Sequence, residues 1–106
     1  MEPKDKGMPQ NQINVELPED VAEGIYSNLA IITHSNQEFV VDFIRIMPGV
    51  PKAKVRARII LTPQHAKRFL HALNDNIRKY ENVHGEISET EQVNVPITLS
   101  GPTGLA

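Results

Sequence analysis

Hydrophobic and polar residues alternate in four segments of the chain, as is typical of half-buried β-strands. The segments are residues 13–17, 25–33, 38–46 and 54–61. The links between them are short, polar or rich in proline and glycine. Because parallel pairing needs longer crossovers, the pattern predicts an antiparallel meander. In the last segment the residues expected to point inward are Val55, Ala57, Ile59 and Leu61.

A helical pattern follows the fourth strand. Thr62 suits an N-cap and Pro63 suits the first helical position, where a missing N–H has no cost. The apolar residues of 63–81 recur at helical spacing and form one stripe: Ala66, Phe69, Leu70, Leu73, Ile77 and Tyr80. The expected fold is therefore α+β, a four-stranded antiparallel meander followed by one C-terminal amphipathic helix (β-β-β-β-α).

The chain of 106 residues is the size of one domain. We expect residues 12–81 to form that domain. Residues 1–11 hold two prolines and a glycine without apolar periodicity, which predicts a disordered arm. Residues 82–106, acidic and then containing glycine and proline, predict a flexible tail.

A homodimer is expected from the size of the domain and from a second apolar sheet face. A domain of about 70 ordered residues is marginal on its own. One helix covers only one face of a sheet. We assign to the other face the residues Ala30, Ile32, Val40 and Ile44.

The composition excludes several classes of protein. Without cysteine there is no disulfide scaffold, no thiolate metal site and no thiol nucleophile. No apolar run approaches the ~18–20 residues of a membrane span. The first residues lack the apolar core of a secretory signal, so we expect a cytoplasmic protein that has no membrane association.

Charge is distributed unevenly along the chain, although the formal net charge is only −2. Residues 45–80 hold nine Lys or Arg and one acid, a net of +8. The segments before and after this basic centre carry −6 and −4. Near-neutrality therefore results from cancellation, and it does not exclude a polyanionic partner.

A row of basic residues follows the fourth strand into the helix. We expect these side chains to neutralise phosphates of nucleic acid. The row consists of Lys52, Lys54, Arg56, Arg58, Lys67 and Arg68. With five aromatic residues in the chain, most of them needed for the core, base stacking is a weaker expectation than phosphate contact.

Two alternatives to nucleic-acid binding stay open for this row. Glu38 and Asp42 lie on the matching face of the preceding strand and would then stand opposite Arg56 or Arg58. In that case the row is a paired, solvated strand face. The other alternative is an acidic protein partner.

The link between the third and fourth strands is unusually constrained. It contains Pro48, Gly49, Val50 and Pro51. Val50, held between two prolines, is a candidate contact with a protein partner. The simpler interpretation is a stiff hairpin connection.

No arrangement of residues indicates catalysis. The four histidines lie at 34, 65, 71 and 84, and no pair has the i, i+4 spacing of a helical metal site. Phosphate-binding glycine loops and nucleophile elbows are absent. We therefore expect no enzymatic activity, no metal, no cofactor and no small-molecule substrate.

Three stretches resemble a known family: Glu23–Asn28 (EGIYSN), Glu38–Phe43 (EFVVDF) and Pro48–Phe69 (PGVPKAKVRARIILTPQHAKRF). They are similar to short bacterial proteins grouped as domain of unknown function 3467, over about residues 12–81. The resemblance implies no catalytic residue and no cofactor. At fold level alone, a dimeric β-β-β-β-α protomer is also similar to single-strand nucleic-acid-binding folds of the Pur-alpha and Whirly type, and to the export chaperone SecB.

The sequence thus predicts a non-enzymatic binding module, associated with nucleic acid or transcription through its basic strand–helix surface. The alternative is a protein-binding or chaperone-like adaptor that uses the apolar sheet face and the Pro48–Pro51 loop.

Overall fold

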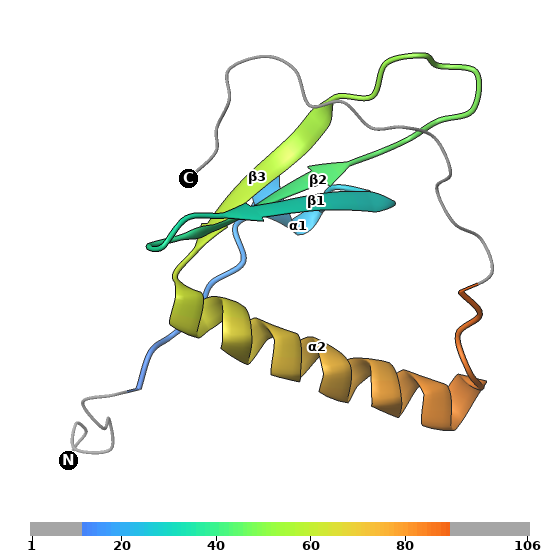
Figure 1. The fold of residues 1–106 in the computed structure, drawn as a ribbon. Coiled ribbons are helices and arrows are strands. Elements are labelled where there is room, and N and C mark those ends of the chain that lie inside the picture. Colours follow the sequence, from blue (N-terminus) through green and yellow to red (C-terminus); the bar gives the residue numbers. More distant parts are fainter. Residues whose placement is uncertain (1–11, 90–106) are drawn as a thin grey trace.

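The computed structural model of the chain describes residues 12–89. Three strands form one antiparallel sheet in the order β1-β2-β3, and a long helix, α2, lies across one side of it (Figure 1). The fold is α+β, a three-stranded antiparallel meander followed by a C-terminal helix. The elements in chain order are α1 (Glu19–Ala22), β1 (Leu29–His34), β2 (Phe39–Ile44), β3 (Val55–Leu61) and α2 (Pro63–His84). The expected arm at 1–11 and the tail from 90 onward lie outside the described residues.

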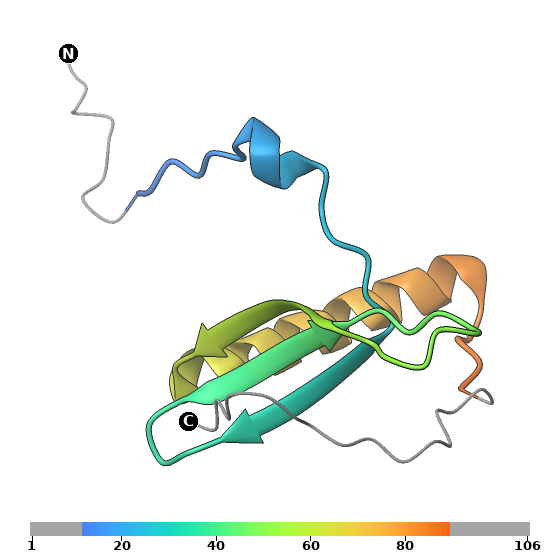
Figure 2. The ribbon, with the colours of Figure 1, turned by 90° about the horizontal axis from the view of Figure 1, so that it is seen from above.

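The first predicted strand is wrong. Residues 13–17 form no strand, and Ile13, Val15 and Leu17 are 80%, 92% and 68% exposed. A strand needs a neighbour for its backbone N–H and C=O groups, and alternation alone does not supply one. Here α1 and Gly24, with φ +80, direct the segment away from the sheet (Figure 2). Within residues 12–89 the sheet therefore has three strands, where the sequence predicts four.

The ends of β1 and β2 are set by side-chain hydrogen bonds. Asn28 Oδ1 accepts a hydrogen bond from the Ile46 N–H at 2.7 Å, and Asn28 Nδ2 donates to the Ile46 C=O at 3.0 Å. Ser27 Oγ donates to the Ile44 C=O at 3.0 Å. These side chains occupy backbone groups that a longer ladder would use. Consequently β1 begins at Leu29 and β2 ends at Ile44, inside the predicted limits of 25 and 46.

The strand register corrects one part of the predicted sheet faces. Ile32 pairs with Val41, and Ala30 pairs with Phe43. Directly paired residues share a face, so Ala30 and Ile32 lie on the same side as Val41. The sequence predicted them on the other side, with Val40 and Ile44. The reason is the turn that begins at Ser35, directly after the end of β1, where the Ser35 N–H donates to the Glu38 C=O at 2.9 Å and fixes the register.

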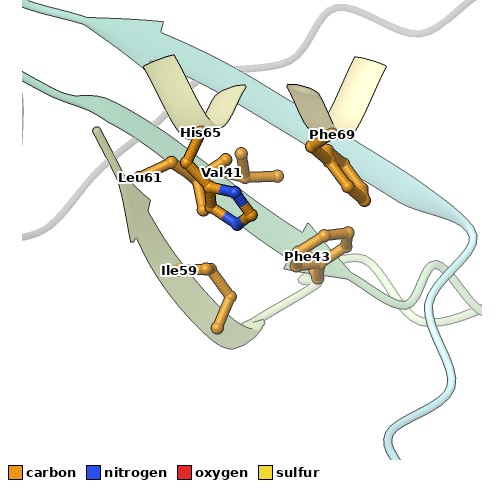
Figure 3. A pocket seen from close by; sticks show the side chains of 6 residues that line it. All are labelled: Val41, Phe43, Ile59, Leu61, His65 and Phe69. Atoms are coloured by element: carbon orange, nitrogen blue, oxygen red, sulfur yellow. The ribbon is translucent and has the colours of Figure 1, made fainter. Parts of the chain in front are cut away.

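The side of the sheet that carries Val41 faces α2. His65 and Phe69 project from the first turns of the helix toward Val41, Phe43 and Ile59 (Figure 3). Together with Leu61 these side chains enclose an apolar pocket of about 250 Å³. The packing between helix and sheet is therefore centred on the beginning of α2.

The buried core of the described residues is small. Its hydrophobic members are Val40, Val41 and Ile44, all on the central strand. The helix α2 contributes no fully buried residue. Its Thr62 N-cap and Pro63 are as predicted, with the Thr62 hydroxyl accepting from the His65 N–H at 3.1 Å. The helix ends at His84, three residues beyond the predicted limit of 81, and Gly85, with φ +93, is its C-cap.

Candidate nucleic-acid interface

The loop between β2 and β3 surrounds a shallow hollow of about 280 Å³. Four of its seven lining residues are cationic and none is acidic. The cationic residues are Arg45, Lys52, Lys54 and Arg56, and the remaining lining residues are Met47, Val50 and Ala53. We call this set of four residues the basic hollow. The hairpin creates it by bringing the end of β2 and the beginning of β3 together.

The shape of the loop depends on a tight turn. The Val50 N–H donates to the Met47 C=O at 3.2 Å, which closes a four-residue turn. Pro48 occupies the second position of this turn, and Gly49, with φ +81, occupies the third. Proline followed by a glycine with positive φ is the pattern of a type II turn. The turn holds Val50 at the rim of the hollow, with about half of the residue exposed.

A β-bulge places Arg56 beside the hollow. Phe43 pairs with Ala57, but Ile44 pairs with Val55, so the register shifts by one residue at this point. Arg56 lies between the two pairs and has no partner of its own on β2. Bulges of this kind bend a strand and redirect its side chains. The same shift moves Val55 to the face of Ile44, which corrects the prediction that it points inward with Ala57, Ile59 and Leu61.

Arg45 belongs to the hollow, although sequence reasoning did not select it. Its Nε is buried and has no hydrogen-bond partner within residues 12–89. A buried donor without an acceptor destabilises a fold by about 1–3 kcal/mol. The predicted hairpin is the feature of the sequence from which Arg45 could have been identified. A hairpin brings a cation at the end of one strand beside cations at the start of the next.

Arg58, which was expected to contact phosphate, is an ion-pair partner instead. Its Nε and Nη2 donate to Asp42 Oδ1 and Oδ2 at 2.6 and 2.8 Å. The two residues pair directly across β2 and β3. The Asp42 side chain is 1% exposed and that of Arg58 is 35% exposed. The alternative of a cross-strand pair therefore holds for Arg58.

The same pair changes the pKa values of both groups. The two hydrogen bonds from Arg58, helped by its charge, lower the pKa of the Asp42 carboxyl in spite of its burial. In return, Asp42 raises the pKa of the Arg58 guanidinium. Asp42 is therefore ionised in the folded protein at neutral pH.

Lys67 and Arg68 lie apart from the basic hollow. They follow Leu61, at the opposite end of β3 from the loop (Figure 1). The six residue steps of β3, at ~3.3 Å each, separate its two ends by about 20 Å. The predicted row is therefore three groups in space: Lys52, Lys54 and Arg56 in the hollow, Arg58 in the ion pair, and Lys67 with Arg68 on the helix.

Within residues 12–89, no group of three or more His, Cys, Asp or Glu side chains is placed to hold a metal ion. No helix in that part of the chain is both long enough and apolar enough to cross a membrane.

The fold and the basic hollow together define a small α+β domain that presents a cationic loop. The chain belongs to the family described as "Protein of unknown function (DUF3467)", whose family model matches residues 1–89. This confirms the resemblance seen in the sequence and extends it beyond residues 12–81 in both directions. No curated protein and no solved structure matches the chain.

Proposed function

We propose that the protein is a non-enzymatic binding module that contacts the phosphate backbone of nucleic acid through its basic hollow. The observation that supports this most is the set of four cations, Arg45, Lys52, Lys54 and Arg56, around one concavity without a lining acid. Phosphate oxygens accept charge-assisted hydrogen bonds from side chains of this kind.

The proposed contact is directed at the backbone and does not read sequence. The hollow has no aromatic lining residue on which a base would stack. Its charged lining consists of two lysines and two arginines. Binding through such groups depends on charge, and it weakens steeply as salt is added.

The test is a fluorescence anisotropy titration with labelled single- and double-stranded DNA and RNA at about 50 and 200 mM salt. If four cations each neutralise one phosphate, affinity for duplex DNA falls roughly 150-fold between these concentrations. Absence of binding to all four nucleic acids at the lower salt concentration contradicts the proposal.

A pair of charge-reversal variants locates the contact. Lys54→Glu with Arg56→Glu changes the net charge by −4 within the hollow. The matched control, Lys67→Glu with Arg68→Glu, makes the same change in the first turns of α2, beyond the far end of β3. We expect the hollow variant to lose at least about tenfold in affinity and the control about threefold or less. Equal losses would show that only the net charge matters.

A protein-binding adaptor is the second candidate, supported by the loop Pro48–Pro51 and by the apolar residues near it. Met47 and Val50 are each about half exposed at the rim of the hollow. Two prolines and the tight turn preorganise them, which lowers the entropy lost on binding. A stoichiometric partner that co-purifies after nuclease treatment and high salt, and that Val50→Glu releases, supports this function. Release by nuclease or by salt alone favours nucleic acid.

A further inference from the structure

The sheet has an open edge along β1. In the described residues β1 pairs only with β2, so one side of its backbone has no strand beside it. Ile32, on the α2 side of this strand, is 63% exposed. Unpaired edges of this kind accept a further strand readily, and proteins that stay monomeric usually cover them.

The segment 12–18 complements this edge: it has the sequence pattern of a strand but pairs with no strand in the described residues. All residues from 12 to 26 are exposed, and the segment projects from the domain (Figure 2). Ile13, Val15 and Leu17 alternate with Asn14 and Glu16, as one apolar face of a strand requires. Within residues 12–89, the backbone N–H groups of 12–17 donate to no backbone C=O.

We propose that the protein is a strand-exchanged homodimer, in which residues 12–18 of each copy pair with the β1 edge of the other. This arrangement completes the fourth strand that the sequence predicts, but completes it between two chains. In its own chain the segment is directed away from β1 by α1 and Gly24. A second copy always offers the same edge, and a two-fold axis satisfies both edges at once.

The apolar layer between α2 and the sheet supports the same arrangement. The packing against the sheet is centred on His65 and Phe69, and the helix diverges from the sheet beyond them (Figures 1 and 3). Leu73 and Ile77 continue the Phe69 face at intervals of four residues, yet each is still more than a third exposed. An added strand beside Ile32 widens the sheet face over this uncovered layer.

The exposed apolar area matches the requirement of a stable dimer. At about 100 Å² per fully exposed aliphatic side chain, the six residues Ile13, Val15, Leu17, Ile32, Leu73 and Ile77 expose roughly 800 Å² in two copies. If apolar atoms form about 60% of the interface, its total area is near ~1,300 Å², within the range of specific interfaces.

Sedimentation equilibrium on the full chain provides the first test. We expect a dimer, of twice the 11.9 kDa chain mass. Val15→Glu places a charge on the apolar face of the segment and is expected to raise the dimer dissociation constant at least about tenfold. Asn14→Glu adds the same charge on the opposite face and is the matched control, with little effect expected. A monomer at all concentrations, or equal effects of the two variants, overturns the proposal.

Complementation between two defective variants tests the exchange itself, even if each variant alone is poorly folded. Val15→Glu damages the segment, and Ile32→Glu damages the edge. A mixed dimer joins the intact segment of the Ile32→Glu copy to the intact edge of the Val15→Glu copy. We therefore expect the mixture to dimerise more strongly than either variant alone. A mixture that gains nothing contradicts strand exchange, and a different protein seated on the edge would give that result.

Discussion

Arg56 and Arg58 are two residues apart on β3 and belong to the same alternating pattern, but they have different surroundings. Arg58 stands opposite a buried carboxylate and forms two hydrogen bonds with it. Arg56 lies in a bulge, has no partner across the sheet and lines the basic hollow with three other cations. The comparison teaches that a row of basic residues is not one site: within residues 12–89, the opposite strand decides which cation forms an ion pair and which forms none.

The largest expected difference between the two arginines is in stability. Arg58→Met leaves the buried Asp42 carboxylate without its partner, which we expect to lower the free energy of unfolding by about 3 kcal/mol. Arg56→Met removes no ion pair within residues 12–89 and is expected to change it by less than about 0.5 kcal/mol. Urea denaturation followed by circular dichroism measures both. Equal losses would mean that the Asp42–Arg58 pair adds nothing specific.

Acid is expected to weaken the same pair without any mutation. Because the pKa of Asp42 is lower in the folded than in the unfolded protein, its stabilising contribution is complete above the unfolded value of about 3.9. It is lost as the pH falls through the lower, folded value. Below pH ~4 the urea midpoint of the wild type should therefore fall. It should fall by more than the midpoint of Asp42→Asn, which has no carboxyl group at this position. Identical shifts in the two proteins would contradict the assigned pKa change.

Arg45 extends the comparison, because its buried Nε has no hydrogen-bond partner within residues 12–89. Arg45→Lys removes the Nε donor that has no partner in the described residues and keeps the charge. We expect the free energy of unfolding to rise by about 1 kcal/mol while affinity for nucleic acid falls. Thermal unfolding and anisotropy measure the two effects. A loss of stability would show that Nε has a structural role.

Local patterns predicted the elements correctly where one residue type sets the geometry. Thr62 and Pro63 mark the start of α2, and the alternation in 38–46 marks β2, because capping and pleating are local properties. Pairing is not local. The register that moves Ile32 to the α2 side and the bulge at Arg56 depend on how separate strands meet. The missing fourth strand follows from the same principle, since the alternation in 13–17 contains no information about which sheet edge accepts it.

The candidate site was predictable in part for the same reason. Clustering of charge in residues 45–80 indicated the basic centre, and Lys52, Lys54 and Arg56 are in the hollow. Arg45 lines the hollow because the hairpin brings the end of β2 beside the start of β3. Arg58 does not line it, because it pairs with Asp42 across the sheet. Sequence spacing also joined Lys67 and Arg68 to the row, although the length of β3 separates them from the loop in space.

The salt dependence of nucleic-acid binding in the wild type and in Arg56→Gln tests the central claim most directly. If the basic hollow binds phosphates, the slope of log K against log salt for duplex DNA is about −3.6 for four contacts, and Arg56→Gln makes it less steep by about 0.9 with no change in stability. Binding with an unchanged slope in Arg56→Gln, or no binding at low salt, would contradict the account.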